Sequence, residues 1–564
     1  MHPKEFWIRR STNTPTPLRS EHLNLNGSGR TRGLLAPLTL WITTLAVWLP
    51  WLGNVPLRDW DEGIVATVAR ATSQQTGLRW LLAVKDAGEP YLNKPPALHW
   101  LIGTSIQSWG EGEWAVRAVP ALVSTLAVPL LVLLRRELSR DQSGERSALA
   151  AGLVLMTLLP MARHGRLAML DGSLVSCSLM LWLGWLGSRR QSRWAVLAGL
   201  GGTGVLLLKP PALIGFTAVI VMITVLEKLS QQHLSQSQPS QQHTIPFRRR
   251  IGWLVLGTTP GLVWHLWHGW WRGLDALVMW GGQGLSRVTT VVEGNQGGWL
   301  VPVTEVMEGG WPWLLLLPAG FRWAWHHRHE RAGLWELGLL VGSAALVLPL
   351  RTQLPWYSHL LWPSIALLCG EGLGQLLVSG KPRWVPSIWT GLGAGLLIAG
   401  SMALLGITEA FPCAPVLSAG VGLLMGGLWM RAPIKIRRLR GLLLLVVGWS
   451  VALLSLWHSR LWLWELNETW DPRPIAAVIR ELPAEDPVIL QGPTRPSLGW
   501  YADRPLRRLQ SERPAERHWL ITRKSPASCR QQPLAINGDW QLWLCPAAPI
   551  STQKRDASVT ELTR

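Results

Sequence analysis

The sequence predicts an all-α polytopic membrane protein that carries a small α/β domain at its C-terminal end. Three observations support this fold class. Charged residues make up only 16% of the 564-residue chain, whereas soluble domains usually contain roughly 25%. Apolar runs of about 20 residues, long enough to cross a hydrocarbon layer, recur along most of the chain. Basic residues stand in short clusters between these runs, as in membrane proteins with cytoplasmic basic loops.

The apolar runs predict about thirteen transmembrane helices. They lie near 34–53, 114–134, 147–162, 170–187, 194–208, 210–227, 251–270, 310–325, 334–350, 355–378, 385–407, 414–430 and 439–458. Only Lys209 separates the fifth run from the sixth, which opens with Pro210-Pro211. Because proline interrupts a helix, we expect a break there.

A basic cluster follows every even-numbered run, for example Arg135 and Arg136 after the second and Arg248 after the sixth. Since cytoplasmic loops are enriched in Lys and Arg, this pattern places the N-terminus in the cytoplasm and the C-terminal region outside. We therefore expect a multi-pass inner-membrane protein whose residues 1–33 form a disordered basic cytoplasmic tail, with no cleavable signal peptide. The membrane domain would cover 34–458, with long outer loops at 54–113 and 271–309 that carry surface helices, and an extracytoplasmic domain would cover 459–564.

The net charge of +20 does not indicate nucleic-acid binding, because the basic residues are dispersed and no recognition motif accompanies them. Short strands are predicted at 487–491, 518–522 and 541–544 in the C-terminal domain. Cys529 and Cys545 lie in the same domain and could form a disulfide if it faces an oxidising compartment. We find no metal-ligand spacing and expect neither metal nor cofactor. We expect the chain to act as a monomer.

The first outer loop opens with Arg58-Asp59-Trp60-Asp61-Glu62-Gly63, followed by apolar residues at helical spacing. This pattern predicts a short amphipathic helix on the membrane surface. Acidic residues at a helix N-terminus complement the helix dipole, which would account for Asp59. Asp61 and Glu62 would lie against the bilayer, where a carboxylate is costly without a partner or a task. A structural and a functional role therefore both stay open for these two.

Three more ionisable residues stand out. Lys94 precedes Pro95-Pro96 and is therefore held on an extended backbone, where it could bind a phosphate or snorkel towards lipid head groups. Asp171 begins an apolar run and could either cap that helix or act in function. Lys209 lies where two runs meet.

The order of these motifs resembles the GT-C superfamily of membrane glycosyltransferases. The likeness is greatest to the branch that contains protein O-mannosyltransferases and the lipid A aminoarabinose transferase. It is carried, in order, by Trp60-Asp61-Glu62-Gly63-Ile64, Leu92-Asn93-Lys94-Pro95-Pro96, His99-Trp100, Val116-Arg117, Leu170-Asp171, Leu208-Lys209-Pro210, Trp264, Arg287 and Leu354-Pro355-Trp356-Tyr357. Three residues depart from the family pattern. Asn93 stands where Glu is usual, and Gln353 where Lys is common. Lys209 is followed by Pro210-Pro211, where Gly and then Pro are usual.

The resemblance implies a polyprenyl-phosphate-linked sugar donor and a lipid, glycan or protein acceptor at the non-cytoplasmic membrane face. The implied catalytic residues are Asp61, Glu62 and Asp171. The donor phosphate would be bound by Lys94, Arg117, Lys209 and Arg287. The substrate pocket would be lined by Tyr91, His99, Trp264 and Tyr357.

Transfer of a hexosyl or pentosyl group would be a single displacement with inversion, because no second carboxylate is placed as a nucleophile. The alternative is a flippase for lipid-linked sugars. Transporters of that kind carry charged or broken helices at the membrane midplane and internally repeated halves. Here the ionisable residues singled out above lie at the outer ends of the runs instead.

Overall fold

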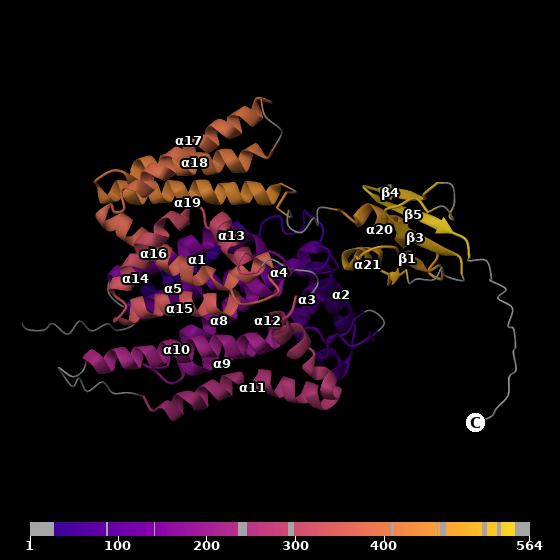
Figure 1. The fold of residues 1–564 in the computed structure, drawn as a ribbon, viewed down its shortest axis with the longest axis horizontal. Helices are drawn as coiled ribbons and strands as arrows, with labels where there is room; N and C mark the ends of the chain where they lie inside the picture. The colour runs from indigo at the N-terminus through magenta and orange to yellow at the C-terminus, as the bar shows by residue number, and fades with distance from the viewer. Residues whose placement is uncertain are drawn as a thin grey trace, which may run out of the picture.

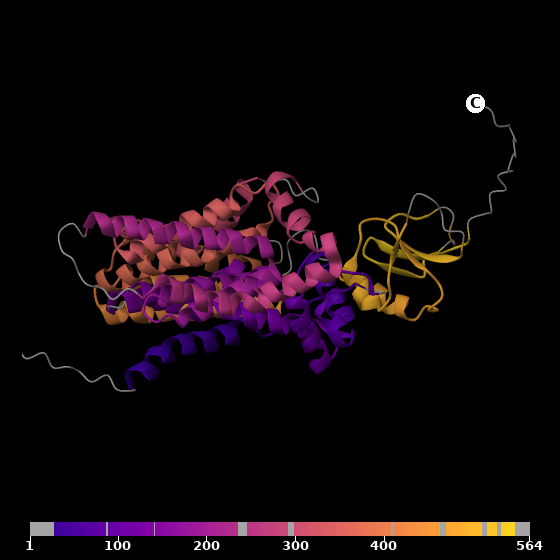
Figure 2. The ribbon, with the colours of Figure 1, turned by 90° about the horizontal axis from the view of Figure 1, so that it is seen from below.

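A computed structural model describes residues 28–85, 88–139, 142–234, 245–291, 298–407, 411–459, 461–462, 470–509, 516–526, 529 and 532–547. Most helices run side by side along the long axis of the molecule, and a small sheet domain stands at one end (Figure 1). The helices keep this common direction when the molecule is turned by 90° (Figure 2). The chain is therefore a helical bundle with one appended domain.

Each predicted apolar run coincides with a helix or with two consecutive helices. The first seven correspond to α1 (Ser28–Trp48), α4 (Glu113–Thr125) with α5 (Ala127–Leu138), α6 (Gln142–Thr157) with α7 (Leu159–Gly165), α8 (Leu170–Gly187), α9 (Trp194–Leu208), α10 (Pro210–Leu234) and α11 (Phe247–Arg272). The last six correspond to η6 (Trp313–Leu316) with α14 (Leu317–His326), α15 (Arg331–Val347), η7 (Pro355–Leu360) with α16 (Trp362–Ser379), α17 (Trp384–Leu404), α18 (Cys413–Met430) and α19 (Lys435–His458). The predicted break at Pro210 is confirmed, since α10 begins there, where a missing N–H costs no helical hydrogen bond.

Six spans of the described chain are individually long and apolar enough to cross a membrane. They are Glu113–Leu138, Leu170–Gly187, Pro210–Ser230, Trp384–Leu404, Cys413–Met430 and Lys435–His458. A seventh would be the pair Gly144–Thr157 and Leu159–Gly165, which is bent by 61°. The apolar parts of α1 and α9 are shorter. The chain is thus a multi-pass membrane protein.

The first outer loop contains three short helices. They are α2 (Asp61–Ser73), η1 (Gly77–Leu81) and α3 (Ala97–Trp109). The predicted helix is confirmed in α2, but most of its residues are buried, including Val65, Ala66, Ala69 and Arg70. The second outer loop contains η4 (Gly273–Leu277), η5 (Gly281–Leu285), α12 (Ser286–Thr289) and α13 (Leu300–Gly309). Both loops stand at the end of the bundle that faces the sheet domain (Figure 1).

The C-terminal domain is a five-stranded sheet with two helices. Its strands are β1 (Val488–Leu490), β2 (Arg507–Arg508), β3 (His518–Thr522), β4 (Ala535–Asn537) and β5 (Trp540–Cys545), in the order β2-β1-β3-β5-β4. β1 is parallel to both of its neighbours, and β5 is antiparallel to both of its own. The helices are α20 (Arg473–Arg480) and α21 (Pro496–Ala502). All three predicted strands are confirmed, while β2 and β4 were not predicted.

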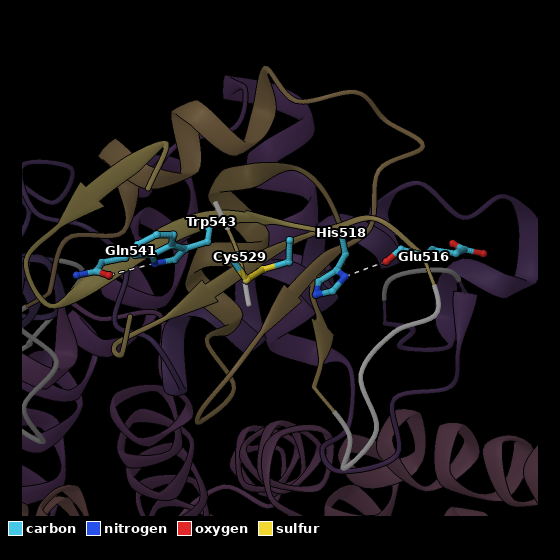
Figure 3. The surroundings of a disulfide bond; sticks show 6 residues. Glu516, His518, Cys529, Gln541 and Trp543 are labelled. Atoms are coloured by element: carbon cyan, nitrogen blue, oxygen red, sulfur yellow. Dashed lines mark hydrogen bonds between the residues drawn. A yellow bond between two sulfur atoms is a disulfide. The ribbon is translucent and has the colours of Figure 1, made fainter. Parts of the chain in front are cut away.

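A disulfide joins Cys529 to Cys545 at the end of β5 (Figure 3). Cys545 lies opposite His518 on β3, so the bond ties the segment after β3 to the middle of the sheet. The pairing that the sequence left open is therefore confirmed. Cys177, Cys369 and Cys413 are free thiols.

Residues 1–27 of the predicted N-terminal tail lie outside the described residues. Helix α1 begins at Ser28, six residues before the predicted start of the first run. Its first turn stands at the end of the bundle opposite the sheet domain (Figure 2).

Candidate active site

Glu62 and Arg117 form a fully buried ion pair between α2 and α4. Arg117 donates from Nε to Oε1 of Glu62 at 2.7 Å and from Nη2 to Oε2 at 2.6 Å. Its remaining N–H groups reach the carbonyls of Leu52, Val55 and Pro56 at 2.7, 2.9 and 2.7 Å. A guanidinium has five N–H donors, so all of those on Arg117 are used. The predicted phosphate ligand is thus saturated by its own protein.

Glu62 is equally well satisfied. It also accepts hydrogen bonds from the backbone N–H of Arg58 at 2.9 Å and of Ala168 at 2.8 Å. Burial alone would raise the pKa of Glu62, but the charge and hydrogen bonds of Arg117 outweigh it and hold the pKa below its usual range. Glu62 therefore stays charged at neutral pH and joins the first outer loop to α4 and to the segment before α8.

Asp61 is the first residue of α2 and keeps 29% of its side chain exposed, in contrast to Glu62. Its Oδ2 lies 4.0 Å from Nη2 of the buried Arg58. Arg58 in turn donates to the sulfur of Met169 at 3.5 Å and stands 5.4 Å above the ring of Trp356. Asp61 is therefore a carboxylate that is accessible on one side and held by a cation on the other. Sequence reasoning did not single out Arg58, although its i, i+3 spacing to Asp61 is a usable signal.

Asp171 lies in the first turn of α8 and is half-buried. The N-cap of this helix is Met169, and no side chain makes a capping hydrogen bond, so the capping alternative for Asp171 is wrong. The segment just before it contacts the first outer loop, because Ala168 bonds Glu62 and Met169 bonds Arg58. Asp61 and Asp171 therefore stand on neighbouring segments.

Three predicted site residues from distant parts of the chain meet in η7 and around it. The ammonium of Lys209 lies 4.5 Å from the ring centroid of Tyr357. Arg287 donates from Nη1 to the Tyr357 hydroxyl at 3.0 Å. Tyr357 follows Trp356, the ring beneath Arg58, so Lys209, Arg287 and Arg58 contact two consecutive residues of η7.

Tyr91 and His99 pack against each other within the first outer loop. Their rings meet edge to face at 5.3 Å, and Tyr91 belongs to a small apolar cluster with Val68 and Ala83. Burial lowers the pKa of His99 to about 4, so the ring is neutral at pH 7. Between them lies the half-buried Lys94, in a bend rather than on the extended backbone that was expected before Pro95.

Trp264 fixes the same loop to α11. Its indole N–H donates to the carbonyl of Leu81 at 3.1 Å, and its ring stacks on His268 at 4.6 Å. A further contact at 6.3 Å reaches Trp100 on α3. The four predicted pocket residues are thus placed at this end of the bundle, and Tyr357 contacts two of the predicted cations.

The C-terminal domain docks on the start of α2 through Asp59. This buried carboxylate accepts hydrogen bonds from the N–H and hydroxyl of Ser497 at 3.2 and 2.6 Å and is bonded by Arg495. A methyl group on Gly63 would stand 2.5 Å from the nitrogen of Ser497, so only glycine permits this approach. The helix-dipole explanation of Asp59 is therefore wrong, because α2 begins after it and its carboxylate faces another domain.

A second set of contacts fixes the other side of this interface. The Tyr501 hydroxyl donates to Glu113 at 2.9 Å and accepts from the N–H of Leu57 at 2.8 Å. Arg70 of α2 lies 3.0 Å from Asp503. The domain thus holds α2 at both ends, including the end that bears Asp61.

Within the ranges that the structure describes, no three His, Cys, Asp or Glu side chains are grouped to hold a metal ion.

The chain is similar in sequence to several known proteins. Residues 93–240 match the family model described as dolichyl-phosphate-mannose-protein mannosyltransferase. The chain is 27% identical over 354 residues to the undecaprenyl phosphate-alpha-4-amino-4-deoxy-L-arabinose arabinosyl transferase 1 of Pseudomonas fluorescens, covering 57% of this chain and 56% of that protein. It is also 27% identical over 404 residues to the corresponding transferase of Pseudomonas aeruginosa, covering 68% and 65%. The chain thus spans a little more than half of the length of the first of these relatives.

The fold is shared with a solved structure. The crystal structure of ArnT from Cupriavidus metallidurans bound to undecaprenyl phosphate superposes with a TM-score of 0.68 at 18% identity, over 90% of this chain and 97% of that one. Its apo form gives a TM-score of 0.65 at 17% identity, over 92% and 98%. By sequence and by fold, the chain is thus similar to GT-C membrane glycosyltransferases of the branch that contains the lipid A aminoarabinose transferases.

Proposed function

We propose that the chain transfers a sugar from a polyprenyl-phosphate carrier to a lipid, glycan or protein acceptor by a single displacement with inversion. One observation carries this proposal: Lys209 and Arg287 converge on Tyr357, and the preceding residue, Trp356, lies beneath Arg58, the partner of the partly exposed Asp61. Cations for a phosphate and a carboxylate for a proton thus stand at the same end of the bundle. The undecaprenyl phosphate-linked sugar in the names of the relatives supports a donor of this class.

Asp61 is the proposed general base. As the acceptor oxygen forms its bond to the anomeric carbon, Asp61 takes the acceptor proton, and the bond from the anomeric carbon to the phosphate oxygen breaks. The electron pair stays on the leaving polyprenyl phosphate, whose negative charge grows. Fixed cations aimed at such charge lower a barrier by about 3 kcal/mol. Lys94, Lys209 and Arg287 fill this role in the proposal.

The geometry supports different tasks for the other predicted residues. Glu62 and Arg117 satisfy each other, so we assign them to positioning Asp61 rather than to contact with substrate. Asp171 would orient the acceptor from the neighbouring segment. Tyr357 would line the pocket, while Tyr91, His99 and Trp264 would hold the first outer loop in place.

Topology forms part of the proposal. About thirteen spans, an N-terminus in the cytoplasm and a C-terminal domain outside would follow from the basic clusters. The disulfide Cys529–Cys545 supports the outer placement, since disulfides persist in oxidising compartments. We propose a monomer that transfers a hexosyl or pentosyl group.

Sugar transfer in proteoliposomes tests the function. Labelled sugar on a synthetic polyprenyl phosphate is supplied with lipid acceptor, and product is measured for the wild type, Asp61→Asn and Glu89→Gln. Glu89 lies exposed on the same loop and serves as the control of equal charge change. Loss of about 100-fold is expected for Asp61→Asn alone, as for removal of a general base. Full activity of Asp61→Asn would refute the assignment, and sugar that crosses the membrane without reaching the acceptor would indicate the flippase.

A further inference from the structure

A cleft of about 830 Å³ opens at the end of the bundle opposite the sheet domain. It lies between α14, α16 and the start of α17, which meet at that end in Figure 1. Its lining includes Arg322, Trp323, His327, Lys381, Arg383 and Trp384. Asp61, Lys209 and Tyr357 belong to other elements, so the cleft is separate from the candidate active site.

The lining is strongly basic. Arg322, Lys381 and Arg383 are exposed, and in the described part of the chain none of the three makes an ion pair or donates a side-chain hydrogen bond. The lining includes no acidic residue. The carboxylate behind it, Glu371, is already bound by Arg135 at 3.0 Å. Three cations therefore converge on one opening without a protein counter-charge.

The walls are apolar and aromatic. Trp323 stacks on His327 at 4.3 Å, and its ring is backed by Arg135 at 5.5 Å. Trp384 is 45% exposed at the mouth, and α17 continues from it with exposed Ile388 and Leu392. A cationic opening thus leads directly onto an apolar helix surface of a membrane-spanning segment. Tryptophan at such a junction is typical of the membrane interface.

We propose that this cleft binds the phosphate headgroup of an anionic phospholipid, with the acyl chains lying along α17. The three cations would contact the phosphate, Trp323 and Trp384 would cover the glycerol region, and the apolar face of α17 would hold a chain. Juxtamembrane basic clusters attract anionic lipids in general. A walled cleft adds a defined stoichiometry, because it admits one headgroup rather than a diffuse layer.

Lipid binding to the intact protein in detergent tests this site. Native mass spectrometry counts the molecules of dioleoyl phosphatidylglycerol or dioleoyl phosphatidylcholine retained by the wild type and by Arg322→Gln/Lys381→Gln/Arg383→Gln. The control, Lys435→Gln/Arg437→Gln/Arg440→Gln, removes the same charge from exposed residues of α19. Because all six side chains are exposed, neither variant should unfold, and a melting curve for each checks this. Arg383→Gln alone serves as the milder variant if the triple one melts early.

The wild type should retain one phosphatidylglycerol with affinity about tenfold higher than that of the cleft variant. The control should stay within about twofold of the wild type, and phosphatidylcholine should bind weakly to all three proteins. Excess glycerol 3-phosphate should not displace the lipid. Equal losses in both variants, equal binding of phosphatidylcholine, or displacement by glycerol 3-phosphate would each overturn the proposal. The sugar-transfer assay is separate, so failure of this site leaves the proposed function untouched.

Discussion

Removal of the Arg495 side chain should release the C-terminal domain from the first outer loop. Arg495 is 12% exposed and bonds the 5% exposed carboxylate of Asp59. It also stands 5.5 and 5.1 Å above the rings of Trp470 and Trp540. Loss of one partner of a buried ion pair costs about 3 kcal/mol or more, because the other charge stays buried. The cation–π contacts add about 1 kcal/mol.

A cost of about 4 kcal/mol corresponds to a roughly thousandfold larger population of the undocked domain. Hydrogen–deuterium exchange of α21 (Pro496–Ala502) in the Arg495→Ala protein measures it, because amides that open with the domain exchange in proportion to that population. Arg523→Ala is the matched control, since Arg523 stands 4.7 Å over the same Trp540 and does not bond Asp59. Its exchange should rise by less than about tenfold. Equal exchange in wild type and Arg495→Ala would refute the docking role of this ion pair.

Three further outcomes follow from the site. Lys209→Ala should raise the KM for the donor about tenfold, because it removes a charged contact worth about 1.5 kcal/mol. Lys85 is exposed, and Lys85→Ala should leave the KM unchanged. Equal KM values for the two variants in steady-state assays would contradict this. Glu62→Gln should lower the free energy of unfolding by about 3 kcal/mol and the Tm with it, because Arg117 would stay buried without its charge partner. The pKa of His99 is near 6.5 in the unfolded chain and about 4 in the folded protein. Between these two pH values the unfolded state binds more protons. The free energy of unfolding should therefore fall by about 3 kcal/mol as the pH falls from 6.5 to 4. His99→Leu should remove that pH dependence, and identical slopes of Tm against pH for both proteins would disprove it.

Local patterns were enough to predict most of the fold. The helices follow from apolar length and from proline positions such as Pro210, and strand β3 was predicted at its observed bounds. The disulfide could be proposed because only two cysteines share the C-terminal domain. In each case the signal lies within a few dozen neighbouring residues.

The roles of individual site residues were harder to predict. The resemblance implies a phosphate ligand at Arg117, and sequence does not reveal that its five N–H donors are already used within the protein. The partner of Asp59 could not be predicted, because Arg495 lies 436 positions away and leaves no periodic signal. The convergence of Lys209 and Arg287 on Tyr357 was expected only through family resemblance.

The docking of α21 also sets an order of events during biosynthesis. Asp59 emerges from the ribosome 436 residues before Arg495, which is roughly 20 to 90 s at common rates of synthesis. Throughout that interval the first outer loop, which bears Asp61, lacks its contacts with the C-terminal domain. The membrane helices can insert during this time. The contacts on α2 form only after the C-terminal domain has folded, formed its disulfide and docked. A chain stopped before residue 495 would therefore lack the contacts from Arg495 and Ser497 that hold Asp59 at the start of α2.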